Sequence, residues 1–277
     1  MLDTISCYPL CDAHRWHRLA VFDRPQKGEN TFGIRDYYRE LWQCNNCGLF
    51  INHHDYDLAS IYEGAYRTAA YEPEKKFRFD AIMNLPFDQS DNKQRVERVL
   101  DYLDRRVQKS QNKLCDIGSG MGVFPAAMLK KGWTATVVDP DEDNFQHLKR
   151  LSGGVDFING FFPTVEIAEQ FDLITFNKVL EHIAPIIETL SGALRFLLPD
   201  GLVYIELPDG ETAASKSLTR QEFFLEHHYV FSMDAIALLA RRARMRVELS
   251  ERIQDPSGKF TLYAFLRPIT SVAHLEY

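Results

Sequence analysis

A glycine-rich turn between a short apolar run and a helical pattern constrains this chain more than any other feature. In LCDIGSGMGVFPAAMLKK the apolar run ends at Asp116, and three glycines follow at every second position, Gly118, Gly120 and Gly122. Glycines let a backbone turn sharply and let a ligand approach it closely. A helix starting here points unpaired N–H groups and its positive dipole end at whatever lies over the turn. The stretch therefore predicts a ligand-binding strand–turn–helix unit.

An acidic residue ends the next apolar run. Asp139 closes TATVVD, seventeen residues after Gly122. Ligands in open parallel sheets bind beyond the carboxyl ends of the strands, so this carboxylate is placed to accept hydrogen bonds from both hydroxyls of a ribose. The spacing G-x-G-x-G differs from the dinucleotide fingerprint G-x-G-x-x-G, because its third glycine comes one residue early.

From residue 113 onward, strand and helix patterns alternate. KLCDIG, TATVVDP, VDFI, FDLITFN and GLVYIEL are strand candidates, and helical segments separate most of them. This alternation predicts a doubly wound α/β fold, with helices on both faces of a mostly parallel sheet. The last two strand candidates, RMRVELSERI and KFTLYAFLRP, are joined by a linker too short for a helical crossover. We therefore expect them to form an antiparallel hairpin at the end of the sheet.

Composition divides the chain into three parts: residues 1–54, 55–112 and 113–277. The first is rich in cysteine, histidine and aromatic residues, and the last carries the α/β pattern. The middle part is predicted to be a helical lid or linker, because apolar residues recur in it at helical spacing. Its second helical pattern follows SDN, so the helix is expected to be capped by Ser90, Asp91 or Asn92. Its first pattern offers candidate cofactor or acceptor contacts at Tyr62, Tyr66 and Arg67.

Paired cysteines mark the first part. They stand in CYPLC and in CNNCGLF, and are Cys7, Cys11, Cys44 and Cys47. Four thiolates in two pairs can close a tetrahedral structural zinc site, so we predict a small zinc-ribbon-like module. The alternatives are that His14 or His17 replaces one cysteine, or that the thiols are buried and reduced. Cys115, inside the first strand of the α/β part, is expected to be a buried small hydrophobe.

Charge and cysteine usage limit the possible partners and compartment. The chain carries 39 acidic and 32 basic side chains, for a net charge of −7, which argues against a nucleic-acid partner. An odd cysteine count speaks against a disulfide framework and for a reducing cytoplasm. MLDTISCYPLC has neither the basic start nor the apolar run of a signal peptide. No apolar run approaches the ~20 residues of a membrane span. The sequence does not indicate an oligomeric state.

The D-x-G-x-G-x-G pattern resembles motif I of the Rossmann-like, class I S-adenosylmethionine-dependent methyltransferases. Asp139 falls where that family has its ribose-binding acid. FDLITFNKVLEHI resembles the family's fourth strand and active-site turn, and LLPDGLVYIELP its fifth strand. The resemblance covers about residues 90–268. It implies a seven-stranded, mostly parallel sheet with an antiparallel last strand, and S-adenosylmethionine as cofactor.

The same resemblance implies where the cofactor lies. The glycine loop lines its methionine end, Asp139 holds the ribose, and Asn177 faces the sulfonium. Residues after the third strand flank adenine, although the family more often has an acid near there. The full expected set is Asp116, Gly118, Ser119, Gly120, Gly122, Asp139, Pro140, Asn159, Gly160, Phe161 and Asn177.

Histidines in two connections are the candidate catalytic groups. Methyl transfer from a sulfonium needs alignment and, for a weakly acidic hydroxyl, a base. Glu181 and His182 stand in VLEHI, just past the fourth strand, and EFFLEHHYVFS places His227 and His228 after the fifth. We expect His182 first, and His227 or His228 next, to act as general base, with Glu181 orienting the imidazole. The alternative for His182 is a structural hydrogen bond at the start of a helix.

A paired-cysteine module ahead of this catalytic fold resembles bacterial methyltransferases that act on sugars, including deoxysugar C-methyltransferases. Those enzymes continue into a further C-terminal domain, whereas this sequence stops near the end of the core fold. We therefore expect methylation of a sugar hydroxyl, in a nucleotide-linked sugar or a surface polysaccharide, ahead of C-methylation. A ribosomal RNA methyltransferase is the other alternative, and the acidic charge disfavours it. The intact glycine loop argues against a non-enzymatic relic.

Overall fold

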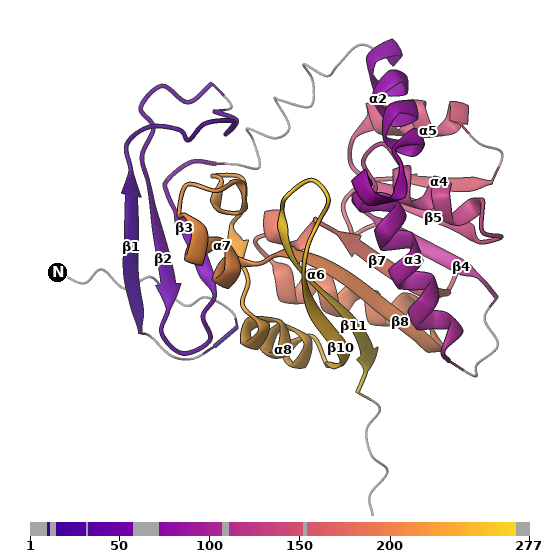
Figure 1. Cartoon of the computed structure of the whole chain (residues 1–277). Coiled ribbons are helices and arrows are strands. Elements are labelled where there is room, and N and C mark those ends of the chain that lie inside the picture. Colours follow the sequence, from indigo (N-terminus) through magenta and orange to yellow (C-terminus); the bar gives the residue numbers. More distant parts are fainter. Residues whose placement is uncertain are drawn as a thin grey trace, which may run out of the picture.

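Two β-sheets, lying side by side in Figure 1, organise this protein. The computed structural model describes residues 10–11, 15–31, 33–57, 72–106, 111–151 and 154–269. Residues Tyr62, Tyr66 and Arg67 of the expected lid lie outside these ranges, as do Cys7 and His14 of the cysteine-rich part.

The larger sheet has seven strands in the order β10-β11-β8-β7-β4-β5-β6. Its central pairs are parallel, and β11 runs antiparallel to both β8 and β10. The doubly wound sheet with its closing antiparallel hairpin is thus confirmed. The strand order reverses at β4, which has β5 on one side and β7 on the other, and this is where ligands bind in such sheets. The strands are β4 (Lys113–Ile117), β5 (Thr134–Asp139), β6 (Val155–Asn159), β7 (Phe171–Asn177), β8 (Leu197–Pro208), β10 (Met245–Gln254) and β11 (Phe260–Pro268).

Helices cover both faces of this sheet. Among the described residues the α-helices are α2 (Glu72–Asn84), α3 (Asp91–Asp104), α4 (Val123–Leu129), α5 (Glu142–Leu151), α6 (Ile186–Gly192), α7 (Gly210–Lys216) and α8 (Met233–Arg242). Successive strand residues face opposite sides. On β4, Leu114 packs with residues of α3 and α4, whereas Cys115 packs with residues of α6 and α8. Cys115 is fully buried, which confirms its expected role as a core residue.

The predicted second helix of the middle part is α3, and its start is capped as expected. Ser90 is the N-cap, and its hydroxyl accepts a 3.1 Å hydrogen bond from the backbone N–H of Lys93. This bond satisfies one of the N–H groups that a helix start leaves unpaired. Among the described helices, none is long and apolar enough to cross a membrane.

The smaller sheet joins the N-terminal part to the α/β part. Its strands β1 (Trp16–Phe22), β2 (Arg39–Cys44) and β3 (Phe50–His53) form an antiparallel meander. The fourth strand, β9 (Tyr229–Val230), comes from the connection after β8 and pairs with β3. Main-chain hydrogen bonds therefore tie the cysteine-rich part to the segment that follows His227 and His228. The division at residues 54 and 112 stays a prediction.

Candidate functional site

The glycine loop connects β4 to α4 with three residues in the left-handed region. Gly118, Gly120 and Gly122 have φ of 65°, 54° and 72°. Main-chain hydrogen bonds fix the loop at both ends: Gly118 N–H donates to the carbonyl of Val138 at 2.8 Å, and Gly122 N–H to that of Ser119 at 2.9 Å. Left-handed φ values are costly for other residues, which explains why three glycines stand here.

The surroundings of these glycines show where the loop has room for a ligand. A Cβ on Gly118 would lie 2.7 Å from Val179, and one on Gly122 only 2.1 Å from Leu148. By contrast, a Cβ on Gly120 meets no heavy atom of the described residues within 4 Å. Gly118 and Gly122 are thus glycines because of packing, whereas Gly120 faces open space.

Asp139, at the end of β5, binds the glycine loop through its carboxylate. One oxygen accepts from Gly120 N–H at 2.8 Å, and the other accepts from Asp141 N–H at 2.9 Å. Burial raises the pKa of this carboxyl, while the two backbone hydrogen bonds oppose that rise. The predicted ribose acid therefore lies beside the open face of the loop.

Asp116, at the end of β4, organises the neighbouring strand β7. Its buried carboxylate accepts hydrogen bonds from the hydroxyl of Thr175 at 2.5 Å and the amide of Asn177 at 2.9 Å. Burial raises the pKa of Asp116 to about 6, against these hydrogen bonds. The Oδ1 atom of Asn177 is buried without a hydrogen-bond partner in the described part of the chain. Thr175 was not predicted, although its position two residues before Asn177 puts it on the same strand face.

The expected adenine side lies at the ends of β5 and β6. The Asn159 amide donates to the backbone carbonyls of Asp139 and Pro140 at 3.3 and 3.2 Å. The ring of Phe161 is 62% exposed. An exposed ring in this position can stack on a planar base.

Helix α2 is tied to the chain that follows Asp139. The ammonium of Lys75, which is 8% exposed, lies 3.5 Å from Asp141 and donates to Asn144 at 3.2 Å. The Phe79 ring meets that of His147 edge-on, with centroids 5.4 Å apart. Sequence reasoning missed these contacts, because nothing local links a lysine to partners 66 and 69 residues away.

The structure brings the two histidine-bearing connections together. Glu181 and His182 lie on a 3₁₀ turn after β7, and His227 lies in the connection before β9. One ligand atom from each of the three residues lies within 4.8 Å of the others. The rings of His182 and His227 are 4.9 Å apart at their centroids. We call these three residues the Glu–His–His cluster.

Backbone carbonyls orient both rings of the Glu–His–His cluster. His182 Nδ1 lies 2.8 Å from the Glu226 carbonyl, and His227 Nδ1 lies 2.7 Å from the Glu222 carbonyl. A carbonyl only accepts, so each Nδ1 carries a hydrogen, and in the neutral form of either ring Nε2 is the acceptor nitrogen. Burial and the neighbouring His182 lower the pKa of His227 to about 3. His227 is therefore held as the neutral imidazole.

The side chain of His228 contacts His54, whereas that of His227 contacts His182. The backbone N–H of His228 donates to the carbonyl of Glu181 at 2.8 Å, and its ring stacks against His54 with centroids 6.5 Å apart. Burial, followed by His182, lowers its pKa. The structure thus places His228 between the cluster and the N-terminal sheet.

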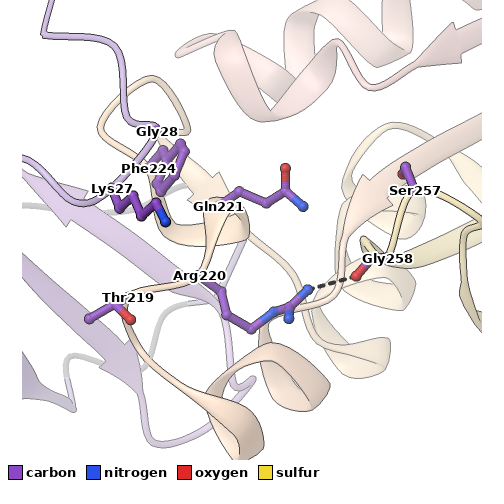
Figure 2. Close-up of a pocket in the computed structure, with 8 residues that line it drawn as sticks. All are labelled: Lys27, Gly28, Thr219, Arg220, Gln221, Phe224, Ser257 and Gly258. Atoms are coloured by element: carbon purple, nitrogen blue, oxygen red, sulfur yellow. Dashed lines mark hydrogen bonds between the residues drawn. The ribbon is translucent and has the colours of Figure 1, made fainter.

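A polar pocket of about 520 Å³ opens where three segments meet. Figure 2 shows the loop after β1, the connection after α7, and the β10–β11 turn around it. The Arg220 guanidinium is held in place by Glu222 at 2.9 Å and by the Gly258 carbonyl at 2.8 Å. The lining residues are Lys27, Gly28, Thr219, Arg220, Gln221, Phe224, Ser257 and Gly258.

A buried ion network, not predicted from the sequence, holds α3 against β8 close to Asp116. The carboxylate of Glu206 pairs with Arg95 at 2.5 Å and with Arg98 at 2.8 Å. It also accepts from the hydroxyl of Tyr204 at 2.6 Å. Burial would raise the pKa of Glu206, but Arg95 in particular holds it far below its usual range. Burial lowers the pKa of Lys178, which lies beside this network.

Three of the four expected cysteine ligands meet in the N-terminal part. The thiols of Cys11, Cys44 and Cys47 lie within 4.8 Å of one another, and Cys11 Sγ is 3.5 Å from Cys44 Sγ. Gly48, at φ 68°, closes the turn with a 3.0 Å hydrogen bond to the Cys44 carbonyl. The ring of His17 binds the Asn45 side chain instead. The arrangement offers thiolates for a metal, and zinc itself stays a proposal.

Comparison with known proteins relates the sequence to methyltransferases. The methyltransferase domain family matches residues 89–248. The ubiquinone biosynthesis O-methyltransferase of Pseudomonas entomophila (strain L48) is 31% identical over 111 residues, which are 38% of this chain and 48% of that protein. The same enzyme of Pseudomonas putida (strain W619) is 31% identical over the same shares. The chain thus spans about half the length of these relatives.

Solved structures share the fold. The Burkholderia thailandensis 1,6-didemethyltoxoflavin-N1-methyltransferase, with S-adenosylhomocysteine bound, has a TM-score of 0.55 at 20% identity, covering 82% of this chain and 99% of its own. A methyltransferase in complex with the Haloferax volcanii Trm112 activator has a TM-score of 0.55 at 16% identity, with 71% and 95% covered. At such identities the likeness shows the fold alone.

Proposed function

The chain belongs to the methyltransferase domain family, and from this premise we propose that it transfers a methyl group from S-adenosylmethionine to a hydroxyl group of a sugar. The sugar is nucleotide-linked or part of a surface polysaccharide. The proposal assigns the cofactor to the glycine loop and the acceptor to the Glu–His–His cluster.

The glycine loop and its neighbours fit the cofactor. Gly120 faces open space, which lets the methionine part approach the backbone. The Oδ1 atom of Asn177 is buried and has no hydrogen-bond partner among the described residues. The ammonium group of the cofactor's methionine part can donate a hydrogen bond to it. Asp139 binds the ribose hydroxyls, and Asn159, Gly160 and Phe161 flank adenine. When bound, the cofactor supplies a methyl group on a sulfonium, which is already a good leaving group.

The Glu–His–His cluster is the observation that best supports a hydroxyl group as the methyl acceptor. A sugar hydroxyl is weakly acidic, so its proton must be withdrawn while the new O–C bond forms. His227 is neutral, with its acceptor nitrogen at Nε2, and His182 carries a hydrogen on Nδ1. Val179, three residues before His182, lies beside Gly118 of the glycine loop. We assign withdrawal of the proton to this cluster, with His182 first in order and His228 positioning the backbone of Glu181.

The polar pocket favours a sugar among hydroxyl acceptors. Its donors include the side chains of Lys27, Thr219 and Gln221, and Figure 2 shows them around one opening. Hydroxyl and phosphate groups need such donors. The pocket and the cluster share the connection from Gln221 to His228. The net charge of −7 disfavours RNA as the acceptor.

Radiolabelled methyl transfer to a panel of acceptors tests the proposal. Nucleotide-linked sugars and polysaccharide fragments should take up label, whereas ribosomal RNA should not, and product analysis distinguishes O- from C-methylation. His182→Ala and His227→Ala should each lower turnover ~10²–10⁴-fold while cofactor affinity is retained. His53→Ala, an exposed histidine on β3, is the matched control. Label in RNA alone, or a loss of only a few-fold in both variants, contradicts the proposal.

Cofactor placement has a separate test. Asp139→Ala should weaken binding of S-adenosylhomocysteine, measured by calorimetry, by ~1.5–3 kcal/mol, because hydrogen bonds to a charged group are lost. Asp156→Ala removes an exposed carboxylate from the next strand, β6, and should leave the affinity unchanged. Equal affinities for all three proteins would remove Asp139 from the site.

A further inference from the structure

We propose that Glu181, His182 and His227 form a binding site for a divalent first-row transition-metal ion. Imidazole nitrogen with carboxylate oxygen is a ligand set that such ions accept. None of its residues is a cysteine, so this site is separate from the proposed zinc site. Its presence does not depend on the identity of the acceptor.

The geometry of the cluster suits one ion. The three ligand atoms, from two segments 45 residues apart, lie within 4.8 Å of one another. Metal–ligand bonds of ~2.0–2.2 Å put two ligands of one ion about 3–4 Å apart. Small side-chain rotations therefore bring all three atoms into coordination distance. Three protein ligands leave coordination positions open for a substrate oxygen.

The two rings are held as metal-binding histidines are held. Each Nδ1–H donates to a backbone carbonyl, that of Glu226 at 2.8 Å and that of Glu222 at 2.7 Å. Hydrogen bonds of this kind fix the ring orientation and present Nε2 as the ligand atom. The 3₁₀ turn that carries His182 is itself held by the His228 N–H, which binds the Glu181 carbonyl at 2.8 Å.

Glu181 gives an independent indication of a cation. Its side chain is 1% exposed, and its Oε2 has no hydrogen-bond partner within the described residues. A buried carboxylate oxygen without a partner is costly, because it has lost its water and gained nothing in return. A cation beside this carboxylate would satisfy its unpartnered oxygen, and one ring nitrogen each of His182 and His227 lies within 4.8 Å of the carboxylate ligand atom.

The consequence for catalysis rests on the proposed function. An ion held by Glu181, His182 and His227 would bind the acceptor's hydroxyl oxygen and lower the pKa of that hydroxyl. The oxygen then bonds to the methyl carbon as the carbon–sulfur bond breaks, and the electron pair of that bond stays on sulfur. With the ion bound, both Nε2 atoms are ligands, so the hydroxyl proton would pass to water; His182 or His227 takes it only when the cluster holds no metal. The products are the methyl ether, the demethylated cofactor and one proton.

Mn²⁺ binding to the full chain, as purified with its cysteine site intact, tests the inference. We expect electron paramagnetic resonance to count one bound Mn²⁺ per chain, with affinity reduced at least tenfold in Glu181→Gln and His227→Gln. His53→Ala should bind as the wild type does. Because a buried variant can fail to fold, a second measurement uses the wild type alone: Mn²⁺ should broaden the NMR signals of His182 and His227 before those of other histidines.

Two outcomes overturn the inference: no bound ion when Mn²⁺, Co²⁺ and Zn²⁺ are each tried, or broadening of other histidines first. If Glu181, His182 and His227 only share a proton among themselves, none of the three ions will bind. Bound Mn²⁺ without methyl transfer to any hydroxyl acceptor leaves the metal site standing and removes the proposed function. If no ion binds and a chelator does not change the rate of methyl transfer to a sugar hydroxyl, the proposed function stands and the metal site is removed.

Discussion

The side-chain amide of Asn52 donates a 2.8 Å hydrogen bond to the backbone carbonyl of His227. The same amide also lies 3.0 and 3.3 Å from the carbonyls of Phe224 and Phe223, while its oxygen accepts from Arg39 at 2.8 Å. Asn52 belongs to β3, and only 6% of it is exposed. A strand of the cysteine-rich part thus holds the connection that carries a cluster histidine. None of these hydrogen bonds of the Asn52 side chain reaches the glycine loop.

Asn52→Ala should therefore separate catalysis from cofactor binding. Removing the amide leaves buried carbonyls unpaired and should lower stability by ~1–3 kcal/mol. We expect turnover to fall at least tenfold, because the connection loosens, while affinity for S-adenosylhomocysteine stays within twofold. Gln43→Ala, a half-buried amide on the neighbouring strand β2, should change neither. Equal losses of turnover and cofactor affinity would show that Asn52 acts on the whole fold.

The glycine loop allows a sharper test of where the cofactor lies. Gly120→Ala puts a methyl group into open space at φ 54°, so the protein should fold at a cost of about 1–2 kcal/mol. That methyl group then occupies the space assigned to the cofactor, and calorimetry should show binding weakened at least tenfold. Gly132→Ala has the same kind of backbone strain, at φ 85° with no neighbour within 4 Å among described atoms, and should keep full affinity. Unchanged affinity in Gly120→Ala would move the cofactor off the loop.

The sequence was informative where the chain follows simple periodicities. Alternating strand and helix patterns from residue 113 predicted the sheet, and the glycine loop with Asp139 predicted its ligand-binding edge. Because connections after neighbouring parallel strands leave the same edge, His182 and His227 could both be expected at the site. That the two rings lie within 4.9 Å of each other depends on the directions of their side chains, which the sequence pattern does not show.

Other features had no local signal. Strand β9 has two residues, too few to show any period. The ion pairs of Lys75 with Asp141 and of Arg95 with Glu206 join residues 66 and 111 positions apart. A charged residue is usually solvated, so nothing in the sequence marks these as buried partners. The helix α7 (Gly210–Lys216) was missed because its sequence, GETAASK, has only two adjacent alanines and so no apolar residues at helical spacing.

Zinc in the cysteine cluster has a direct measurement. Protein purified without chelator should carry about one zinc per chain at this site, in keeping with closed structural sites. Cys44→Ser should lose that zinc, whereas Cys115→Ser, in the core of the α/β part, should keep it. Elemental analysis with thiol counting checks both variants. Because the cysteines lie outside the glycine loop, cofactor affinity should survive zinc loss, and a parallel loss of affinity would contradict this arrangement. No zinc in the wild type would contradict the site itself.

Acid should weaken the contact between His54 and His228, which flank the paired strands β3 and β9. Burial, followed by the nearby His228, lowers the pKa of His54 to about 4. His53 and Arg39 act in the same direction, and Asp55 opposes them. In the unfolded chain the pKa returns to about 6.5. At a pH between these two pKa values, His54 therefore binds a proton in the unfolded state but not in the folded state. Stability from His54 is complete above pH ~6.5 and is lost as the pH falls toward 4, by at most ~3 kcal/mol.

Urea unfolding at pH 7.5, 5.5 and 4.5 measures this contribution. His54→Phe keeps a ring against Tyr56, whose own ring stacks on His54 at 5.2 Å, but it cannot take up a proton. Between pH 7.5 and 4.5 the wild type should lose ~1–3 kcal/mol more unfolding free energy than His54→Phe does. His53→Phe, at an exposed position beside it, should lose nearly as much as the wild type, because His53 is a smaller cause of the shift than burial and His228. If the wild type and His54→Phe lose stability in parallel, the acid sensitivity belongs to other groups.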